Sequence, residues 1–191
     1  MAYRQGLDTE TVVQAAMEIA DAHGVEQVTL AALAAKLQVK TPSLYNHIKG
    51  LPALKKQLSL RGLTRIKGAM VEAVLGKSGD EALLAAGLAY VDFARKQPGL
   101  YDAMTAAQDL MDPELKEASH QIVGLILRIL EGYSFGEEEA LHVVRGFRSL
   151  VHGFASLELK NGFQMNLDRD ESLKLLLTTY LRGLHEMRTV R

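Results

Sequence analysis

Two short helices and the turn between them are encoded by the stretch Val28-Thr29-Leu30-Ala31-Ala32-Leu33-Ala34-Ala35-Lys36-Leu37-Gln38-Val39-Lys40-Thr41-Pro42-Ser43-Leu44-Tyr45-Asn46-His47-Ile48-Lys49. In its first half, apolar side chains recur from Leu30 to Leu37 at the spacing of one helix face. Thr29 precedes this stripe, where its side-chain oxygen can accept a free amide hydrogen of the first turn. The pattern therefore predicts a helix capped by Thr29.

The second half of the stretch predicts another short helix about three residues later. Pro42 suits the first turn of a helix because its fixed backbone angle is already helical, and Thr41 can cap that turn. Leu44 and Ile48 give this helix a short apolar edge, and Gly50 ends it.

A further helix is predicted upstream, with Asp8 as its cap and Gly24 as its stop. Its apolar face consists of Val12, Ala15, Ala16, Ile19 and Ala20. Three short helices with a tight turn between the last two make a helix-turn-helix.

In a helix-turn-helix, the last helix enters the major groove of DNA, so it needs small or polar side chains outward and a buried anchor behind them. Leu44 and Ile48 suit the anchor. The residues that suit contact with DNA are Thr29, Lys40, Thr41, Pro42, Ser43, Tyr45, Asn46, His47, Lys49 and Lys55. Among them Thr41, Ser43 and Asn46 are placed for base edges, and the phosphate donors around them include Lys56 as well.

Two of these assignments compete with a purely structural role. Tyr45 suits a core aromatic that braces the third helix against the first, and a tyrosine can do both. His47 suits a phosphate donor or an ordinary surface histidine.

The distribution of charge supports a contact with phosphates. The net charge is −1, but residues 1–67 hold nine bases and five acids, while the remainder holds 13 bases and 18 acids. No acid occurs between Glu26 and Glu72. Such a basic segment either faces phosphates or forms a solvated helix face.

The run from Val28 to Val39, followed by Ser43-Leu44-Tyr45-Asn46-His47-Ile48-Lys49, resembles the N-terminal domain of the tetracycline-repressor (TetR) family of transcriptional regulators. The resemblance covers residues 8–60. It implies an all-helical homodimer with a DNA-binding head on each subunit, and a larger C-terminal domain that dimerises and binds a small effector. On family grounds it also implies a repressor that an effector releases from a palindromic operator.

Two positions depart from the family pattern. Gln38 occupies the turn between the helices, where the family usually has glycine, and a left-handed conformation there costs glutamine about 1 kcal/mol relative to glycine. Leu51 and Pro52 stand where the family commonly has a lysine and an acid, so Lys49 or Lys55 would have to supply that phosphate contact.

The rest of the chain also reads as helical, which predicts an all-α protein. The expected helices span 51–75, 80–96, 100–107, 113–132, 136–160 and 170–188, with breaks at glycine, proline and asparagine. We expect residues 1–50 to form the helix-turn-helix domain and residues 51–191 to form the effector-binding and dimerisation domain, with the structural boundary inside the fourth helix.

The last two long helices are the expected dimer interface. Gly146 and Gly153 are seven residues apart, so they share one helix face and permit another helix to approach closely. The run Arg145–Phe154, which contains His152-Gly153, is similar to one TetR subgroup with a His-Gly pair in mid-helix. The motif Pro98-Gly99-Leu100-Tyr101, followed by Met104, is also found in that subgroup.

A pocket for the effector should be apolar with a few polar groups. The side chains of the middle helices that suit it are Tyr90, Phe93, Tyr101, Met104, Met111, Leu127, Phe147 and His152. Each of them also suits a simple helical core.

Two other functions compete with a regulator. The Glu-x-x-His spacing of di-iron helical bundles occurs twice, in Glu117 with His120 and in Glu139 with His142. If these residues bind iron, the chain is a metal-dependent oxidase. An adaptor that kept the fold but lost DNA binding is the third interpretation. We expect no cofactor, no metal and no enzymatic activity.

No cysteine, secretion signal or membrane span is evident in the sequence. The absence of cysteine excludes disulfides, thiolate zinc sites and cysteine nucleophiles. We therefore expect a cytoplasmic protein whose partners are double-stranded DNA, a second copy of itself and a small molecule.

Overall fold

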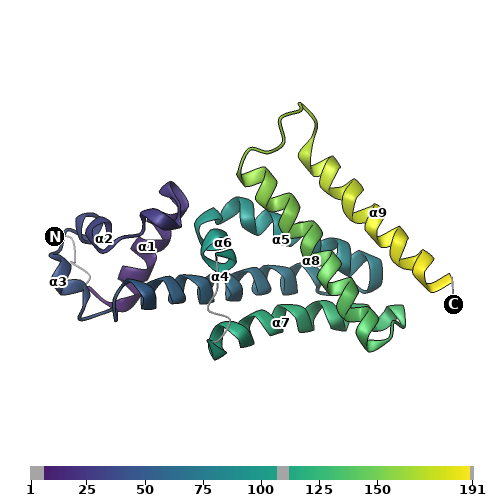
Figure 1. Cartoon of the computed structure of the whole chain (residues 1–191), viewed down its shortest axis with the longest axis horizontal. Coiled ribbons are helices and arrows are strands. Elements are labelled where there is room, and N and C mark those ends of the chain that lie inside the picture. Colours follow the sequence, from purple (N-terminus) through teal and green to yellow (C-terminus); the bar gives the residue numbers. More distant parts are fainter. Residues whose placement is uncertain (1–6, 107–111, 190–191) are drawn as a thin grey trace. The chain divides into compact units, whose positions relative to one another are not determined.

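A computed structural model of the chain describes residues 7–106 and 112–189 (Figure 1). These residues form helices joined by turns, with no strand among them. In chain order the elements are α1 (Thr9–His23), η1 (Val25–Gln27), α2 (Leu30–Leu37), α3 (Thr41–Leu44), α4 (Leu51–Val74), α5 (Gly79–Lys96), α6 (Pro98–Thr105), α7 (Pro113–Leu130), η2 (Glu131–Tyr133), α8 (Glu137–Leu159) and α9 (Arg169–Thr189). The fold is therefore all-α, as the sequence predicted. Within the described residues no helix combines the length and the apolar character that a membrane span requires.

The chain divides into two compact units. The first holds the residues up to Thr64 together with Gln97–Lys116, and the second holds Arg65–Lys96 together with Glu117–Arg191. The division falls inside α4, and α6 belongs to the first unit although α5 belongs to the second. The functional boundary after residue 50 stays a prediction, because these units are defined by packing.

The first unit begins with the caps that the sequence predicted. The carboxylate of Asp8 accepts the amide of Thr11 at 2.7 Å, and the hydroxyl oxygen of Thr29 accepts the amide of Ala32 at 3.1 Å. Gly24 follows α1 with a φ of 89°, a value that favours glycine. The predicted apolar face of α1 is buried in full.

The third helix is shorter than predicted and is capped differently. It ends at Leu44, and residues 45–47 form a turn in which the amide of His47 bonds the carbonyl of Leu44, three residues back. The hydroxyl of Thr9 donates to the carbonyl of His47 at 2.9 Å, which ties the end of this turn to the start of α1. Lys40, not Thr41, occupies the N-cap position, and its side chain makes no capping hydrogen bond in the described part of the chain.

The sixth helix, α6, begins two residues earlier than the predicted start at residue 100. The helix begins at Pro98, because proline is accepted in the first turn, where its missing amide hydrogen is not needed. Gly99 lies against the end of α1, and a Cβ atom there would be 2.4 Å from the backbone nitrogen of Asp21. The amide of Gly99 donates to the carboxylate of Asp21 at 2.8 Å. These contacts fix α6 to α1 within the first unit.

In the second unit, α5 packs against α8 and α9. Gly87 permits the approach, since a Cβ atom there would be 2.9 Å from the side chain of Leu177. Arg95 donates two hydrogen bonds to Glu158, which is only 8% exposed, and a third to Asp170. Its guanidinium group thereby ties α5, α8 and α9 together.

Candidate nucleic-acid interface

The turn between α2 and α3 has the geometry of a helix-turn-helix. Gln38 ends α2 in the left-handed conformation, with φ 56° and ψ 41°, as its place in the turn required. Leu33 of α2, Leu44 of α3 and Ile48 are all buried. The two helices are thus anchored from behind, and their outer side chains are held in place.

The predicted DNA-binding residues lie at the surface of the first unit. Those that are exposed are Thr29, Lys40, Pro42, Tyr45, Asn46 and Lys49, and those that are half-buried are Thr41, Ser43, His47 and Lys55. Tyr45 is 59% exposed, which rules out the alternative that its ring fills the core. Within residues 40–49, only the anchors Leu44 and Ile48 are buried. This short stretch of chain therefore presents polar groups of several kinds at the surface.

Several bases near this surface are held by acids of the same unit. Arg61 makes a two-pronged ion pair with Glu10, and Lys36 pairs with Glu18 at 2.8 Å. Lys55 lies 3.5 Å from Glu26. These pairs link helices to one another, and they reduce the positive charge that the segment offers to phosphates.

Lys56, one of the expected phosphate donors, is held in the same way. Its ammonium group lies 2.6 Å from the carboxylate of Asp112 and also pairs with Glu114. These hydrogen bonds raise the pKa of Lys56 above its ordinary value. By contrast, neither Lys40 nor Lys49 has an ion pair within the part of the chain that the structure describes.

The hydroxyl group of Thr29 is oriented by its cap. Its oxygen accepts the amide of Ala32, and the hydroxyl hydrogen can still be donated to an acceptor in solution. Thr29 is exposed, so a phosphate oxygen could approach it.

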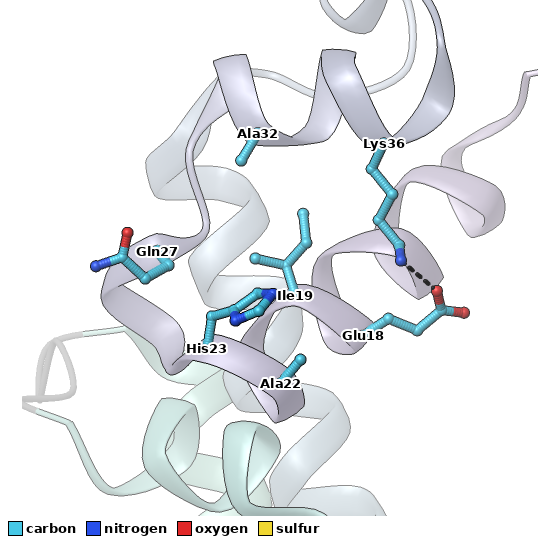
Figure 2. Close-up of a pocket in the computed structure, with 7 residues that line it drawn as sticks. All are labelled: Glu18, Ile19, Ala22, His23, Gln27, Ala32 and Lys36. Carbon is cyan, nitrogen blue, oxygen red and sulfur yellow. Dashed lines mark ion pairs between the residues drawn. The ribbon is translucent and has the colours of Figure 1, made fainter.

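An open pocket that the sequence did not reveal lies between α1 and α2 (Figure 2). The side chains that line it are Glu18, Ile19, Ala22, His23, Gln27, Ala32 and Lys36. The Glu18–Lys36 ion pair closes one side, and Ile19 forms part of the floor. None of the predicted DNA-binding residues lines this pocket.

The predicted effector residues are divided between the two units. Tyr101 and Met104, both buried, belong to the first unit. Those in the second unit are Tyr90, Phe93 and Phe147, which are buried, and Leu127 and His152, which are half-buried. Met111 lies outside the described residues. Burial lowers the pKa of His152, and the charges of Arg148 and Lys160 lower it further.

The di-iron alternative gains no support from the geometry. Glu117, His120 and His142 are exposed, and His142 lies 3.9 Å from Glu138 rather than in a ligand set. Among residues 7–106 and 112–189, no three histidine, aspartate or glutamate side chains are grouped so that they could hold a metal ion.

The two glycines of α8 have different surroundings. A Cβ atom on Gly146 would lie 2.8 Å from the hydroxyl oxygen of Tyr180 on α9, and that hydroxyl donates to the carbonyl of Val143 at 2.7 Å. Gly146 therefore allows α8 and α9 to approach within the chain. A Cβ atom on Gly153 would meet nothing within 4 Å, so this part of α8 is open.

Comparison with known proteins agrees with this geometry. Residues 83–180 match the tetracyclin repressor-like C-terminal domain. The chain is 45% identical to the HTH-type transcriptional regulator YobS of Bacillus subtilis, over 96% of both chains. It is 26% identical to the tetracycline repressor protein class D of Escherichia coli, over 92% of this chain and 79% of the repressor.

The fold is also found in solved structures. A protein of unknown function from Rhodococcus sp. RHA1 superposes with a TM-score of 0.82 at 23% identity, over 96% of this chain and 98% of that one. The helix-turn-helix at the N-terminus, the helical C-terminal part and the identity to YobS lead to one conclusion. The chain belongs to the TetR family of DNA-binding transcriptional regulators.

Proposed function

We propose that this regulator is a dimeric repressor, which binds a palindromic operator through residues 1–50 and leaves it when residues 51–191 bind a small molecule. The observation that carries the proposal is the outward display of polar side chains around α3 with Leu44 and Ile48 buried behind them. One relative is named a tetracycline repressor, and this similarity supports repression rather than activation. The proposed action needs no catalytic step.

In the proposed complex, the side chains divide into two groups. Thr41, Pro42, Ser43 and Asn46 face base edges in the major groove, where an asparagine amide can pair with adenine. The groups that face phosphates are Thr29, Lys40, Tyr45, His47, Lys49 and Lys55. This division assigns sequence preference to one group and general affinity to the other.

The assignment is tested by selecting bound sequences from a random DNA library with the full-length chain. Asn46→Ala should change the preferred base at one position of each half-site, because only base-edge contacts carry sequence information. Ser78→Ala, at an exposed position of the second unit, is the control and should select the same sequences as the native chain. If Asn46→Ala selects the native sequences too, Asn46 does not contact a base.

The proposed dimer interface is one face of α8 and α9. On α8 the residues Leu150, Gly153 and Leu157 follow at steps of three and four, and none is fully buried, whereas Gly146 faces Tyr180 of the same chain. Leu176, Gly183 and Met187 of α9 lie on the side that carries Tyr180, which bonds α8. Small and apolar side chains at helical spacing suit a bundle of two α8 and two α9 helices, and an operator with two half-sites requires two heads.

Two open glycines provide the test of the dimer. Among the described residues, no atom lies within 4 Å of a Cβ position on Gly153 of α8 or Gly124 of α7, so a Cβ atom meets no obstacle at either in an isolated chain. Gly153→Arg should yield a monomer in sedimentation equilibrium and abolish operator binding, whereas Gly124→Arg should stay dimeric. A native chain that sediments as a monomer at all concentrations would refute the dimer.

The sign of regulation is tested with DNA from the chain's own locus. Regulators of this kind often control neighbouring genes, so promoter DNA beside the gene should be retarded by the native chain. A reporter fused to that promoter should be more active when the gene is deleted. A fall in reporter activity would identify an activator instead.

A further inference from the structure

The loop between α8 and α9 (residues 160–168, Figure 1) is fixed at both ends. At its start, Asn161 is left-handed with φ 54°, and the amide of Gly162 donates to the carbonyl of Leu157 at 2.7 Å. At its end, Asp168 accepts the amides of Asp170 and Glu171 at 2.7 and 2.9 Å. These are the contacts that terminate one helix and start the next.

The middle of the loop is anchored by an aromatic contact. The ring of Phe163 packs against the ring of Phe154 on α8, with 4.9 Å between their centroids. The loop is therefore held against the second unit by hydrogen bonds and by packing.

This anchored loop holds two large apolar side chains in solvent. Met165 is 79% exposed and Leu167 is 67% exposed. Together with Phe163 and Arg169 they line a cavity of about 360 Å³. An apolar surface at a fixed position, bordered by polar groups, is characteristic of a surface that another molecule covers. Methionine suits such a surface because its side chain adapts to the shape of a partner.

The position of the loop indicates which molecule covers it. A Cβ atom on Gly162 would lie 3.1 Å from the side chain of Leu157, so the loop directly adjoins a residue of the proposed dimer face. The loop also connects the two helices that form that face. A two-fold interface presents the same surface from both copies, so a second copy on α8 and α9 brings apolar groups beside this loop.

We propose that residues 161–168 form an arm that docks Met165 and Leu167 onto a second copy of this chain. The proposal rests on the dimer proposed above and extends its interface beyond the four helices. The arm strengthens the dimer and thereby fixes the two heads to one another on the operator.

The first experiment measures the dissociation constant of the dimer for the full-length chain by sedimentation equilibrium. The double variant Met165→Ser/Leu167→Ser removes the apolar side chains at positions that are exposed in one copy, so the fold is retained. Leu75→Ser is the control, because Leu75 is 68% exposed and lies outside α8, α9 and their loop. The double variant should raise the dissociation constant at least tenfold, and the control should leave it unchanged.

A second experiment uses the absence of cysteine in the native sequence. A single cysteine, introduced by Leu167→Cys or by Leu75→Cys, is labelled with a maleimide over a range of protein concentrations. Labelling at position 167 should slow as dimer forms, while labelling at position 75 should not change.

The outcomes separate the two proposals. If the native chain dimerises, but the double variant has the native dissociation constant and position 167 is labelled at the same rate in dimer and monomer, the arm is refuted and the helical dimer stands. If the native chain is a monomer throughout, both fail.

Discussion

Among single residues, Gln38 has the clearest expected effect on the free energy of unfolding. Its left-handed backbone is imposed by the turn between α2 and α3, and a residue with a Cβ atom is strained there by about 1 kcal/mol. The side chain is exposed, and no hydrogen bond from the residues that the structure describes fixes it. The turn therefore depends on the backbone conformation and not on the glutamine side chain.

Gln38→Gly should raise the stability of the first unit by about 1 kcal/mol, because glycine adopts this conformation without strain. Gln38→Ala keeps the Cβ atom and should melt within about 1 °C of the native chain, since surface changes are worth little. Thermal unfolding followed by circular dichroism measures both. A glycine variant that melts below the alanine variant would contradict strain at this position.

Asp80 accounts for a pH dependence of stability. Partial burial tends to raise the pKa of its carboxyl group, but hydrogen bonds from Tyr133 and His185 outweigh that effect and hold the pKa below the ordinary value of 3.8. The imidazole of His185 lies 2.8 and 2.9 Å from the two carboxylate oxygens. The carboxylate thus joins the start of α5 to η2 and α9.

The stabilisation from Asp80 should be complete above about pH 5, where the unfolded carboxyl is also ionised, and should disappear as the pH falls through the lowered pKa. Asp80→Asn should lower the melting temperature at pH 7 by about 2–4 °C, the effect of losing roughly 1 kcal/mol. The difference from the native chain should shrink toward pH 2. Glu81→Gln, at the next exposed position, is the control and should show no such difference.

At the scale of elements, the contact of α6 with α1 is the least tolerant of change. Gly99→Ala would place a Cβ atom 2.3 Å from the carbonyl carbon of Ala20, a distance that the backbone cannot accept without moving. We expect a loss of about 3 kcal/mol, at the upper end of overpacking effects, and weaker operator binding.

Gly124→Ala is the matched control within a helix. No atom of the described residues lies within 4 Å of its Cβ position. Alanine should therefore leave the melting temperature unchanged or raise it, because alanine favours a helix over glycine by up to about 1 kcal/mol. Thermal unfolding and operator titration compare the two variants. If Gly99→Ala matches the control in both, the close approach of α6 and α1 is not essential.

At the scale of the whole molecule, the charge of the first unit is partly neutralised from within. Lys36, Lys55 and Arg61 each pair with an acid of α1 or η1, while Lys40 and Lys49 have no ion pair in the described part of the chain. Fewer cations are thus available for phosphates than the sequence count indicates.

Lys49→Ala should weaken binding to all DNA sequences alike and should make the salt dependence less steep. A dimer loses two phosphate contacts, so the slope of log K against log salt concentration should fall by about 2. Lys77→Ala, an exposed lysine of the second unit, should leave the slope unchanged. A Lys49→Ala slope equal to that of the native chain would remove Lys49 from the phosphate contacts.

The helices and the caps of α1 and α2 could be predicted because both depend on neighbours in the sequence. The side chains of Asp8 and Thr29 accept amide hydrogens from residues three positions later, and the apolar face of α1 follows from the helical repeat alone. The early end of α3 at Leu44 had no such local signal, and the turn that follows it is bonded to Thr9, 38 residues away, through the carbonyl of His47.

The sequence by itself determined the all-α fold, the helix-turn-helix and its buried anchors Leu44 and Ile48, since short-range periodicity and capping encode them. Only the tertiary structure decided that α6 belongs with the first unit, that Tyr45 is exposed, and that Lys56 is held by Asp112 and Glu114. These features depend on contacts between residues far apart in the chain. Their free energies come from packing and charge in three dimensions, which no local pattern contains.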